Sequence, residues 1–537
     1  MSDDPRVLIL GLDGATFTVL EPFMRSGLMP NLAKLTQGGV RADLRSTMPP
    51  LTPPAWTTLM TGKRPGHHGV FDFFQKEAPG SEYYRLSTSN DIKTPTIWSL
   101  ASDYDKKVIS LNFPVMFPAP QVNGSVVPGG WMPWRQLRLG CYPPGLFDRL
   151  KELPSFDPKE LSLDMELEAK AIDGCPDDEY EEWIELHARR EARWIEILTY
   201  LMTSEEPADL VAVMFDGTDK LQHLCWRFID PASRPAEPTE WEQRMIDLCE
   251  GYYSKLDAML GDIIELCGPN TTTVVASDHG FGPTWDMFYV NTWLEREGFL
   301  VWADESSATA DDSAPRVGFD AMTRHITELD WSKTVAYAAT PSSQGINVVE
   351  KLPGTDEPMT AERRAEIQAE IIARLEQVEN PFTGSKMVTD IVTRDEAFSG
   401  PHELIAPDVS FMPADGAAIS ILRSDDVVRR RELANGNHRF EGIFICNGPD
   451  TRSGVIIDQV SITQIAALVL YSLGVPIPTD LDGDVPAEVF PPGHLDQVPP
   501  QFVEPVATVA TNGSDIDLDA DEEDMVVARL RALGYVE

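Results

Sequence analysis

Three short apolar runs in the sequence each lead into acidic or histidine side chains. "RVLILGLDG" reaches Asp13, "ADLVAVMFDGTDKLQH" reaches Asp219 and His223, and "TTTVVASDHG" ends at Asp278 and His279. Carboxylate oxygens and imidazole nitrogens are the donors that hold zinc and similar divalent metals in proteins. These positions could therefore support metal-dependent chemistry.

Most of these residues also have a purely structural interpretation when each is taken alone. Asp13 in "GLDGA" could be a turn residue, because Asp side chains readily bond to nearby backbone amides. Asp219 and His223 are four residues apart, so they share a helical face with or without a metal. His438 in "NGNHRF" could lie in a surface loop.

Asp278 and His279 are harder to explain in this way. Two ionisable groups at the end of an apolar strand need a compensating partner. Taken together, the candidates supply three carboxylates and three imidazoles, enough for three ligands on each of two divalent ions. Mixed nitrogen and oxygen donors favour zinc, or another transition metal such as manganese, over magnesium. The predicted ligands are Asp13, Asp219, His223, Asp278, His279 and His438.

A hydroxyl in "PPLTPPAWTTLMTG" could act as the nucleophile of such a site. Thr52 lies in a Pro-flanked turn before a predicted helix at 55–61, where a helix N-terminus favours a phosphate group. Metal coordination would lower the hydroxyl pKa and produce an alkoxide for in-line attack. Thr52 could instead be only an N-cap, and Thr57, Thr58 and Thr61 are weaker candidates within the helix.

Secondary-structure patterns predict how these side chains are positioned. The apolar runs are short and continuous, as in parallel strands that are covered on both faces. Segments 180–202 and 239–266 have helical periodicity and each precedes one of the runs. Strands that alternate with helices predict an α/β sandwich, in which ligands bind beyond the carboxyl ends of the strands.

Composition shifts suggest how the chain is divided. We predict an α/β core at 1–302 that closes at 431–495, with an inserted α+β subdomain at 316–430 that shapes the substrate pocket. The subdomain should contain an amphipathic helix with Ile367, Ile371 and Leu375 on one face. An acidic flexible loop at 303–315, a linker at 496–520 and a C-terminal helix at 521–537 complete the prediction.

The charge balance excludes several kinds of partner. With 44 basic and 86 acidic residues among 537, the net charge is -42. Such a surface opposes broad electrostatic attraction to nucleic acid or to an anionic membrane. No apolar stretch is long enough to span a bilayer, and the six cysteines have neither metal-binding nor disulfide-framework spacing. We expect a cytoplasmic protein of undetermined oligomeric state.

The ordered motifs resemble those of a known family. "LGLDG", "TPPAWTTLMTGKRPGHHGVFDF", "DGTDKLQH", "SDHGFGP" and "NHRFEG" resemble the type I phosphodiesterase and nucleotide pyrophosphatase family of the alkaline phosphatase superfamily, especially its phosphohydrolase- and phosphomutase-like members. The resemblance runs from about residue 6 to residue 485. It implies an alkaline-phosphatase-like three-layer sandwich with a mostly parallel central sheet.

The resemblance also implies a role for each matching residue. One metal would be held by Asp219, His223 and His438, and the other by Asp13, Asp278 and His279. Thr52 matches the nucleophile, which bridges both ions and forms a phosphoenzyme that water hydrolyses. A sulfatase-type Cys or Ser motif is absent, which favours phosphoryl transfer.

Substrate identity is less well specified. Nucleotide pyrophosphatases place an Asn downstream of the nucleophile, whereas this chain has Asp72 and Phe73 there, so a nucleotide substrate is not implied. We expect a metal-dependent phosphohydrolase that acts on a small phosphate ester, most readily a phosphodiester. A phosphomutase and a non-catalytic metal-binding scaffold are the alternatives.

Overall fold

The computed structural model describes residues 6–505 apart from 77, 79–80, 82–83, 130–135, 163–169, 172–173, 205–206, 304–327, 341 and 343. The predicted acidic loop beyond residue 303 and the predicted C-terminal helix at 521–537 lie outside the described residues. No described helix combines the length and the apolar character that a bilayer-crossing segment requires.

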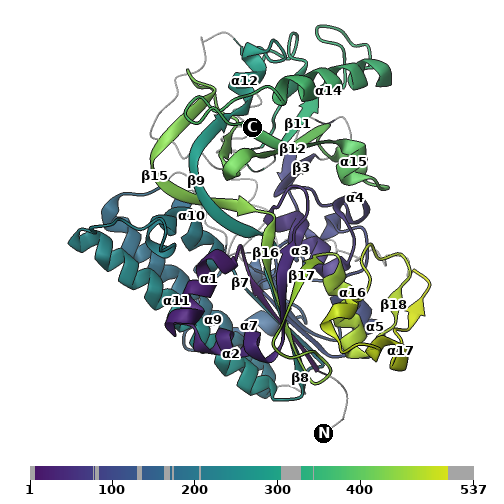
Figure 1. Ribbon diagram of the computed structural model, residues 1–537. Helices are drawn as coiled ribbons and strands as arrows, with labels where there is room; N and C mark the ends of the chain where they lie inside the picture. Colours follow the sequence, from purple (N-terminus) through teal and green to yellow (C-terminus); the bar gives the residue numbers. More distant parts are fainter. Residues whose placement is uncertain are drawn as a thin grey trace.

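An eight-stranded sheet forms the centre of the lower part of the molecule (Figure 1). Neighbouring strands are parallel, except that β16 is antiparallel to both of its neighbours. The mostly parallel sheet predicted from the apolar runs is therefore confirmed. In spatial order the strands are β17 (Val455–Ser461), β2 (Val40–Arg45), β16 (Glu441–Asn447), β8 (Thr271–Ala276), β1 (Arg6–Leu12), β7 (Leu210–Phe215), β5 (Val108–Leu111) and β6 (Gly124–Val127).

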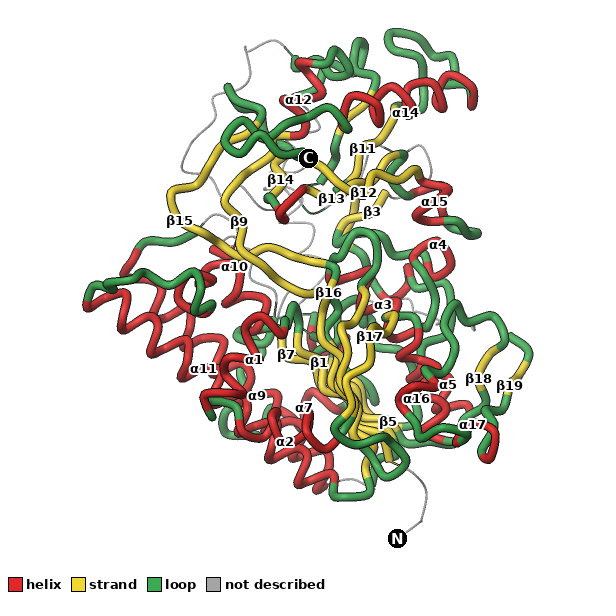
Figure 2. Tube along the Cα trace, in the orientation of Figure 1, coloured by secondary structure: helices red, strands yellow, loops and turns green. Residues whose placement is uncertain are grey.

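Helices cover both faces of this sheet and make the three layers of the predicted sandwich (Figure 2). Each face has its own apolar core, because residues alternate between the two faces along β1: Leu8 packs on one side and Ile9 on the other. One layer contains α1 (Phe17–Ser26), α2 (Pro30–Gly38), α7 (Leu146–Leu150), α9 (Tyr180–Ser204), α10 (Gly217–Ile229) and α11 (Glu240–Cys267). The other contains α3 (Thr52–Thr61), α5 (Ile97–Asp103) and α16 (Gln464–Leu473).

A smaller α+β body lies above the carboxyl ends of the central strands (Figure 1). Its four-stranded sheet has the order β10 (Ala336–Tyr337), β11 (Gly345–Val348), β13 (Val409–Pro413) and β12 (Val388–Thr393). The predicted amphipathic helix is α14 (Ala361–Leu375), and Ile367, Ile371 and Leu375 are its buried residues.

The core of the upper body extends beyond the segment predicted as an insertion. It also contains Phe288, Trp293 and Leu300, which precede residue 316. The domain boundaries themselves stay a prediction. Remaining elements of this body are α12 (Val290–Arg296), α15 (Arg394–Phe398), and a three-stranded sheet of β14 (Ala418–Ser420), β9 (Gly280–Tyr289) and β15 (Val428–Arg439).

Strands β9 and β15 connect the two bodies. β9 begins next to the end of β8, rises into the upper body, and pairs there with β15, which returns toward the central sheet (Figure 2). The register places His438 opposite Phe281, so the last residues of β15 return to the start of β9. β16 follows β15 directly, so the chain re-enters the central sheet immediately after His438 and Arg439.

Two smaller sheets complete the described fold. One pairs β3 (Phe74–Lys76) with β4 (Tyr84–Leu86), and the other pairs β18 (Ile477–Pro478) with β19 (Phe502–Val503). In the described part of the predicted linker, 496–505, Phe502 and Val503 pair with the strand at 477–478. Three further short helices in the described residues are α4 (Pro65–His68), α6 (Leu137–Gly140) and α17 (His494–Gln497).

The fold depends in part on a helix cap that comes from a distant residue. α2 has no side-chain cap of its own, and Asp257 of α11 accepts from Leu32 N at 2.8 Å and Asn31 N at 3.0 Å. We predict that Asp257→Ala lowers stability by about 1–3 kcal/mol, because buried helix-terminal amides lose their acceptor. Urea unfolding should show this loss, whereas Asp247→Ala on the exposed side of α11 should change stability by less than about 0.5 kcal/mol. Equal midpoints for the two variants would contradict the prediction.

Candidate active site

The six predicted ligands converge at the carboxyl end of the central sheet. The ends of β1, β7 and β8 are in register, with Leu12 opposite Phe215 and Gly11 opposite Ala276. The polar residues follow the ends of these strands by one to eight positions, either directly or on α10. The residues brought together are Asp13 after β1, Asp219 and His223 on α10, Asp278 and His279 after β8, and His438 near the end of β15.

Asp219, His223 and His438 form one compact group. His223 Nε2 lies 3.4 Å from Asp219 Oδ1, and His438 Nε2 lies 3.3 Å from the same oxygen. The two Nε2 atoms are 3.1 Å apart. Ligand bonds of 2.0–2.1 Å in tetrahedral geometry place neighbouring donor atoms about 3.3 Å apart. The spacing of these three atoms therefore fits a zinc-sized cation.

Asp13, Asp278 and His279 form the second group, which is fully buried. His279 Nε2 lies 3.2 Å from Asp278 Oδ2 and 3.7 Å from Asp13 Oδ1. The two groups are adjacent, since the rings of His279 and His438 stack with centroids 3.7 Å apart. Asp219, His279 and His438 also have donor atoms within 4.8 Å of one another. The two groups of donors therefore form one continuous cluster.

Backbone carbonyls orient all three imidazoles in the same way. Nδ1 faces Gly436 O at 3.2 Å in His223, Gly280 O at 3.2 Å in His279, and Pro50 O at 2.9 Å in His438. A carbonyl oxygen only accepts, so each Nδ1 must carry the hydrogen and donate it. In a neutral ring, Nε2 then presents a lone pair to the cluster, which is the arrangement typical of metal-binding histidines.

The charges of the cluster are poorly compensated by the protein itself. Asp13 Oδ1, Asp219 Oδ1 and Asp278 Oδ2 are buried and form no hydrogen bond within the described structure. Burial, with repulsion from the neighbouring carboxylates, raises the pKa of Asp13 well above its ordinary value. Burial raises the pKa of Asp278 to about 8 and lowers the pKa of His279 far below normal. Divalent cations would supply the missing positive charge, so the residues present fit such ions.

Thr52 lies beside this cluster at the start of α3. Its hydroxyl oxygen is 3.4 Å from His279 Nε2, and the side chain is only 3% exposed. The alternative that Thr52 is merely an N-cap is wrong, because Leu51 occupies the N-cap position and Thr52 is the first helical residue. The side chain of Thr52 therefore does not cap the helix.

The helix offers fewer amide donors to an anion than the sequence suggested. Pro53 and Pro54 have no backbone N–H, and the amide of Ala55 donates to Leu51 O at 3.0 Å. Among the first four residues of α3, only the amide of Thr52 is left for a ligand. The first turn of α3 therefore offers an anion the helix dipole but few amide donors.

The weaker hydroxyl candidates are all engaged elsewhere. Thr57 and Thr61 donate to the backbone carbonyls four residues earlier, and Thr58 Oγ1 lies 3.0 Å from His68 Nε2. The basic pair that follows the helix is engaged as well: Lys63 forms an ion pair with Asp480, and Arg64 with Asp482. None of these residues competes with Thr52 for a role in the cluster.

Three supporting contacts were not predicted from the sequence. Thr218 Oγ1 donates to Asp13 O at 2.5 Å, Ser46 Oγ donates to Asp278 O at 2.5 Å, and Gly14 N donates to Asp278 Oδ1 at 3.1 Å. Each contact joins segments that are far apart in the chain, so no local pattern reveals it. Together they fix the backbone and the side-chain angle of the buried carboxylates.

Phe281 is a further neighbour that sequence reasoning did not single out, although it lies in the "SDHGFGP" motif. Its ring packs edge-on against His223, with centroids 4.8 Å apart. A Cβ at Gly14, whose φ is +64°, would lie 2.8 Å from this ring. The glycine and the phenylalanine therefore fit together directly beneath the ligands.

Comparison of the sequence with protein-family models identifies the family to which the chain belongs. Residues 7–438 match the model of the family described as type I phosphodiesterase / nucleotide pyrophosphatase. The chain belongs to this family. Its resemblance to the alkaline phosphatase superfamily, inferred from the motifs, is thereby confirmed, and this type I phosphodiesterase family member is a phosphoric ester hydrolase. No curated protein matches it in sequence.

Several solved structures are similar to this phosphodiesterase family member over most of its chain. Human ectonucleotide pyrophosphatase / phosphodiesterase 5 is 14% identical, with a TM-score of 0.50 over 89% of this chain and 97% of that chain. An inactive murine form in complex with AMP has a TM-score of 0.49 at 14% identity, covering 88% and 96%. Phosphonoacetate hydrolase from Sinorhizobium meliloti 1021 in complex with phosphonoacetate scores 0.48 at 15% identity, covering 88% and 96%. The human protein supports the same overall fold, and at these identities nothing finer follows.

Metal binding should stabilise the folded protein, because it neutralises buried charge. Zinc at one hundred times its dissociation constant should add about 2.7 kcal/mol per site. We expect a higher melting temperature with Zn²⁺ than after chelation, and one cation fewer per chain by elemental analysis in Asp219→Asn. Asp262→Asn on the exposed face of α11 is the matched control and should bind as much metal as the wild type. An unchanged metal content in Asp219→Asn would contradict the assignment.

Proposed function

We propose that this phosphoric ester hydrolase is a metal-dependent phosphodiesterase in which Thr52 is the nucleophile. The observation that carries the proposal is the position of the Thr52 hydroxyl, 3.4 Å from His279 Nε2 at the edge of the ligand cluster. A buried hydroxyl that neither caps its helix nor bonds to its own backbone is available for chemistry. Its place beside six potential ligands supports a role in attack on phosphorus.

Two divalent cations, most suitably zinc for this set of nitrogen and oxygen donors, would lower the hydroxyl pKa and offset negative charge on the phosphate. Asp219, His223 and His438 would hold one ion, and Asp13, Asp278 and His279 the other. Three carboxylates balance much of the charge of two such ions. The donor distances among Asp219, His223 and His438, and the proximity of Asp13, Asp278 and His279, support this division of ligands, although Asp219, His279 and His438 also lie close enough to share an ion.

The reaction would proceed in two displacements. Thr52 Oγ1 loses its proton to solvent and attacks phosphorus in line, which forms a phosphothreonine as the bond to the ester oxygen breaks. The leaving alkoxide takes a proton from water. A water molecule then attacks the phosphothreonine, which releases the phosphate product and returns the hydroxyl. The rigid first turn of α3, with its two prolines, keeps the Thr52 oxygen in place throughout.

Two alternatives make different predictions about the phosphoryl group. A phosphomutase would return it to the substrate, so reaction in H₂¹⁸O would leave released product unlabelled, whereas a hydrolase incorporates one ¹⁸O. A non-catalytic scaffold would bind metal without turnover. A buried hydroxyl in contact with His279 of the ligand set favours the hydrolase over the scaffold.

We predict that Thr52→Ala lowers kcat/KM on a chromogenic phosphodiester by on the order of 10³-fold or more, because the nucleophile is removed. Thr52→Ser should retain measurable activity, since a hydroxyl remains at the same position. Acid quenching with a phosphorus-labelled substrate should trap a labelled chain in the wild type and none in Thr52→Ala. All three proteins should bind equal amounts of metal. Full activity in metal-loaded Thr52→Ala would rule out this mechanism.

A further inference from the structure

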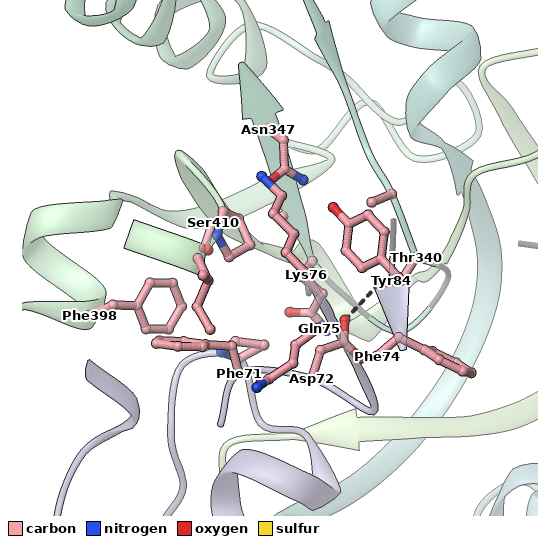
Figure 3. A pocket seen from close by; sticks show the side chains of 16 residues that line it. Phe71, Asp72, Phe74, Gln75, Lys76, Tyr84, Thr340, Asn347, Phe398 and Ser410 are labelled. Carbon is pink, nitrogen blue, oxygen red and sulfur yellow. Dashed lines mark hydrogen bonds between the residues drawn. The ribbon is translucent and has the colours of Figure 1, made fainter. Parts of the chain in front are cut away.

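A narrow cavity lies between the proposed active site and the upper body. Figure 3 shows its lining, which comes from the segment at 71–76 on one side and from the sheet of β11 and β13 on the other. Pro49 also borders it, three residues before Thr52. Three residues of chain span at most about 10 Å, so the cavity lies within reach of a substrate bound at Thr52.

Asp72 holds the two walls of this cavity together. Its carboxylate accepts from Thr340 Oγ1, Ser342 Oγ and Phe73 N, each at 2.6 Å (Figure 3). Burial raises its pKa to about 6, and these donors stabilise the charged form. Because three donors occupy the carboxylate, Asp72 is a structural link between the bodies and not a contact for the ligand.

Lys76 is the unexplained charge in this cavity. The side chain is only 4% exposed, and within the described structure it forms no hydrogen bond or ion pair. Burial lowers its pKa below the ordinary value for lysine. A buried ammonium group without a partner is costly, so its retention calls for a compensating anion.

The acids nearest to Lys76 are already paired with arginines. Asp408 lies 2.9 Å from Arg364 and 3.1 Å from Arg394, and Glu350 lies 2.7 Å from Arg364. Neither carboxylate forms an ion pair with Lys76 within the described structure, although both attract its charge from a greater distance.

Polar groups that could orient a ligand surround the ammonium group. Gln75 Oε1 and Gln344 Oε1 are buried and form no hydrogen bond within the described residues. Asn347 and Ser410 line the same cavity, and Figure 3 shows the side chains of Lys76 and Asn347 extending into the same region of it. The two glutamine oxygens are acceptors and do not bind an anion themselves; the donors that line the cavity are the Lys76 ammonium group, the Asn347 amide nitrogen and the Ser410 hydroxyl, which suit a small oxyanion.

We propose that Lys76 binds a second anionic group, a carboxylate or a phosphate, on the organic part of the ester whose phosphorus is attacked by Thr52. This inference rests on the proposed function and adds the class of substrate to it. The preferred substrate is then a small phosphate ester with two separated anionic centres. One is processed at the ligand cluster and the other is held in the cavity at 71–76.

The test compares matched esters in metal-loaded protein. The probes are 4-nitrophenyl ethyl phosphate, its 2-carboxyethyl analogue and its 2-phosphonoethyl analogue, so the arms distinguish carboxylate from phosphate-like anions. Of the two charged esters, the one with the higher kcat/KM should exceed the neutral ester by about tenfold in kcat/KM. Lys76→Met should abolish this preference and leave the neutral ester within about twofold of the wild-type rate. Lys351→Met is the control, because Lys351 is exposed and paired with Asp356.

A binding measurement separates this inference from the mechanism. Metal-loaded Thr52→Ala should bind 3-phosphonopropionate about tenfold more tightly than ethylphosphonate, and Thr52→Ala/Lys76→Met should bind both equally. The melting temperature of Lys76→Met should equal or exceed that of the wild type, since an uncompensated buried charge is removed. Equal binding of the two phosphonates by Thr52→Ala would overturn the inference and leave the proposed function intact. If neither phosphonate binds and no ester is hydrolysed, both are overturned.

Discussion

Mutual repulsion among buried donor atoms is the constraint on which the rest of the structure depends. Three carboxylates and three imidazole lone pairs meet in a region that excludes water, and several carboxylate oxygens have no hydrogen-bond donor. The protein holds each imidazole by its Nδ1, and it holds the backbones of Asp13 and Asp278 with hydroxyl donors, so the donor atoms stay together. The charge of the buried Lys220 offsets only part of the repulsion at Asp13.

The fold makes this convergence possible because parallel strands end at one edge of a sheet. β1, β7 and β8 are neighbours, so residues that are more than two hundred positions apart become adjacent. β9 and β15 then connect this edge to the upper body and bring His438 back to it. Apolar cores on both faces keep the strand ends in register, which an exposed two-layer sheet would not achieve as firmly.

Sequence reasoning succeeded where a local pattern carries the information and failed where distant segments meet. Asp13 and Asp278 could be predicted because each directly follows a continuous apolar strand. The role of Asp72 could not, since its partners Thr340 and Ser342 are about 270 positions away and lie in another body. Thr52 was correctly placed at a helix start, but Leu51 occupies the cap, and the adjacent prolines remove amides that an anion would use. The sequence did not indicate that Lys76 is buried without an ion-pair partner, because this depends on which distant segments pack around it.

Anomalous diffraction at the zinc edge, from crystals of the zinc-loaded protein, would locate any ions among the six ligands. We expect two peaks, one within bonding distance of Asp219, His223 and His438 and the other within bonding distance of Asp13, Asp278 and His279, with the Thr52 oxygen between them. A fully loaded protein with no peak at the cluster, or with its zinc bound only at other acidic residues, would contradict this expectation.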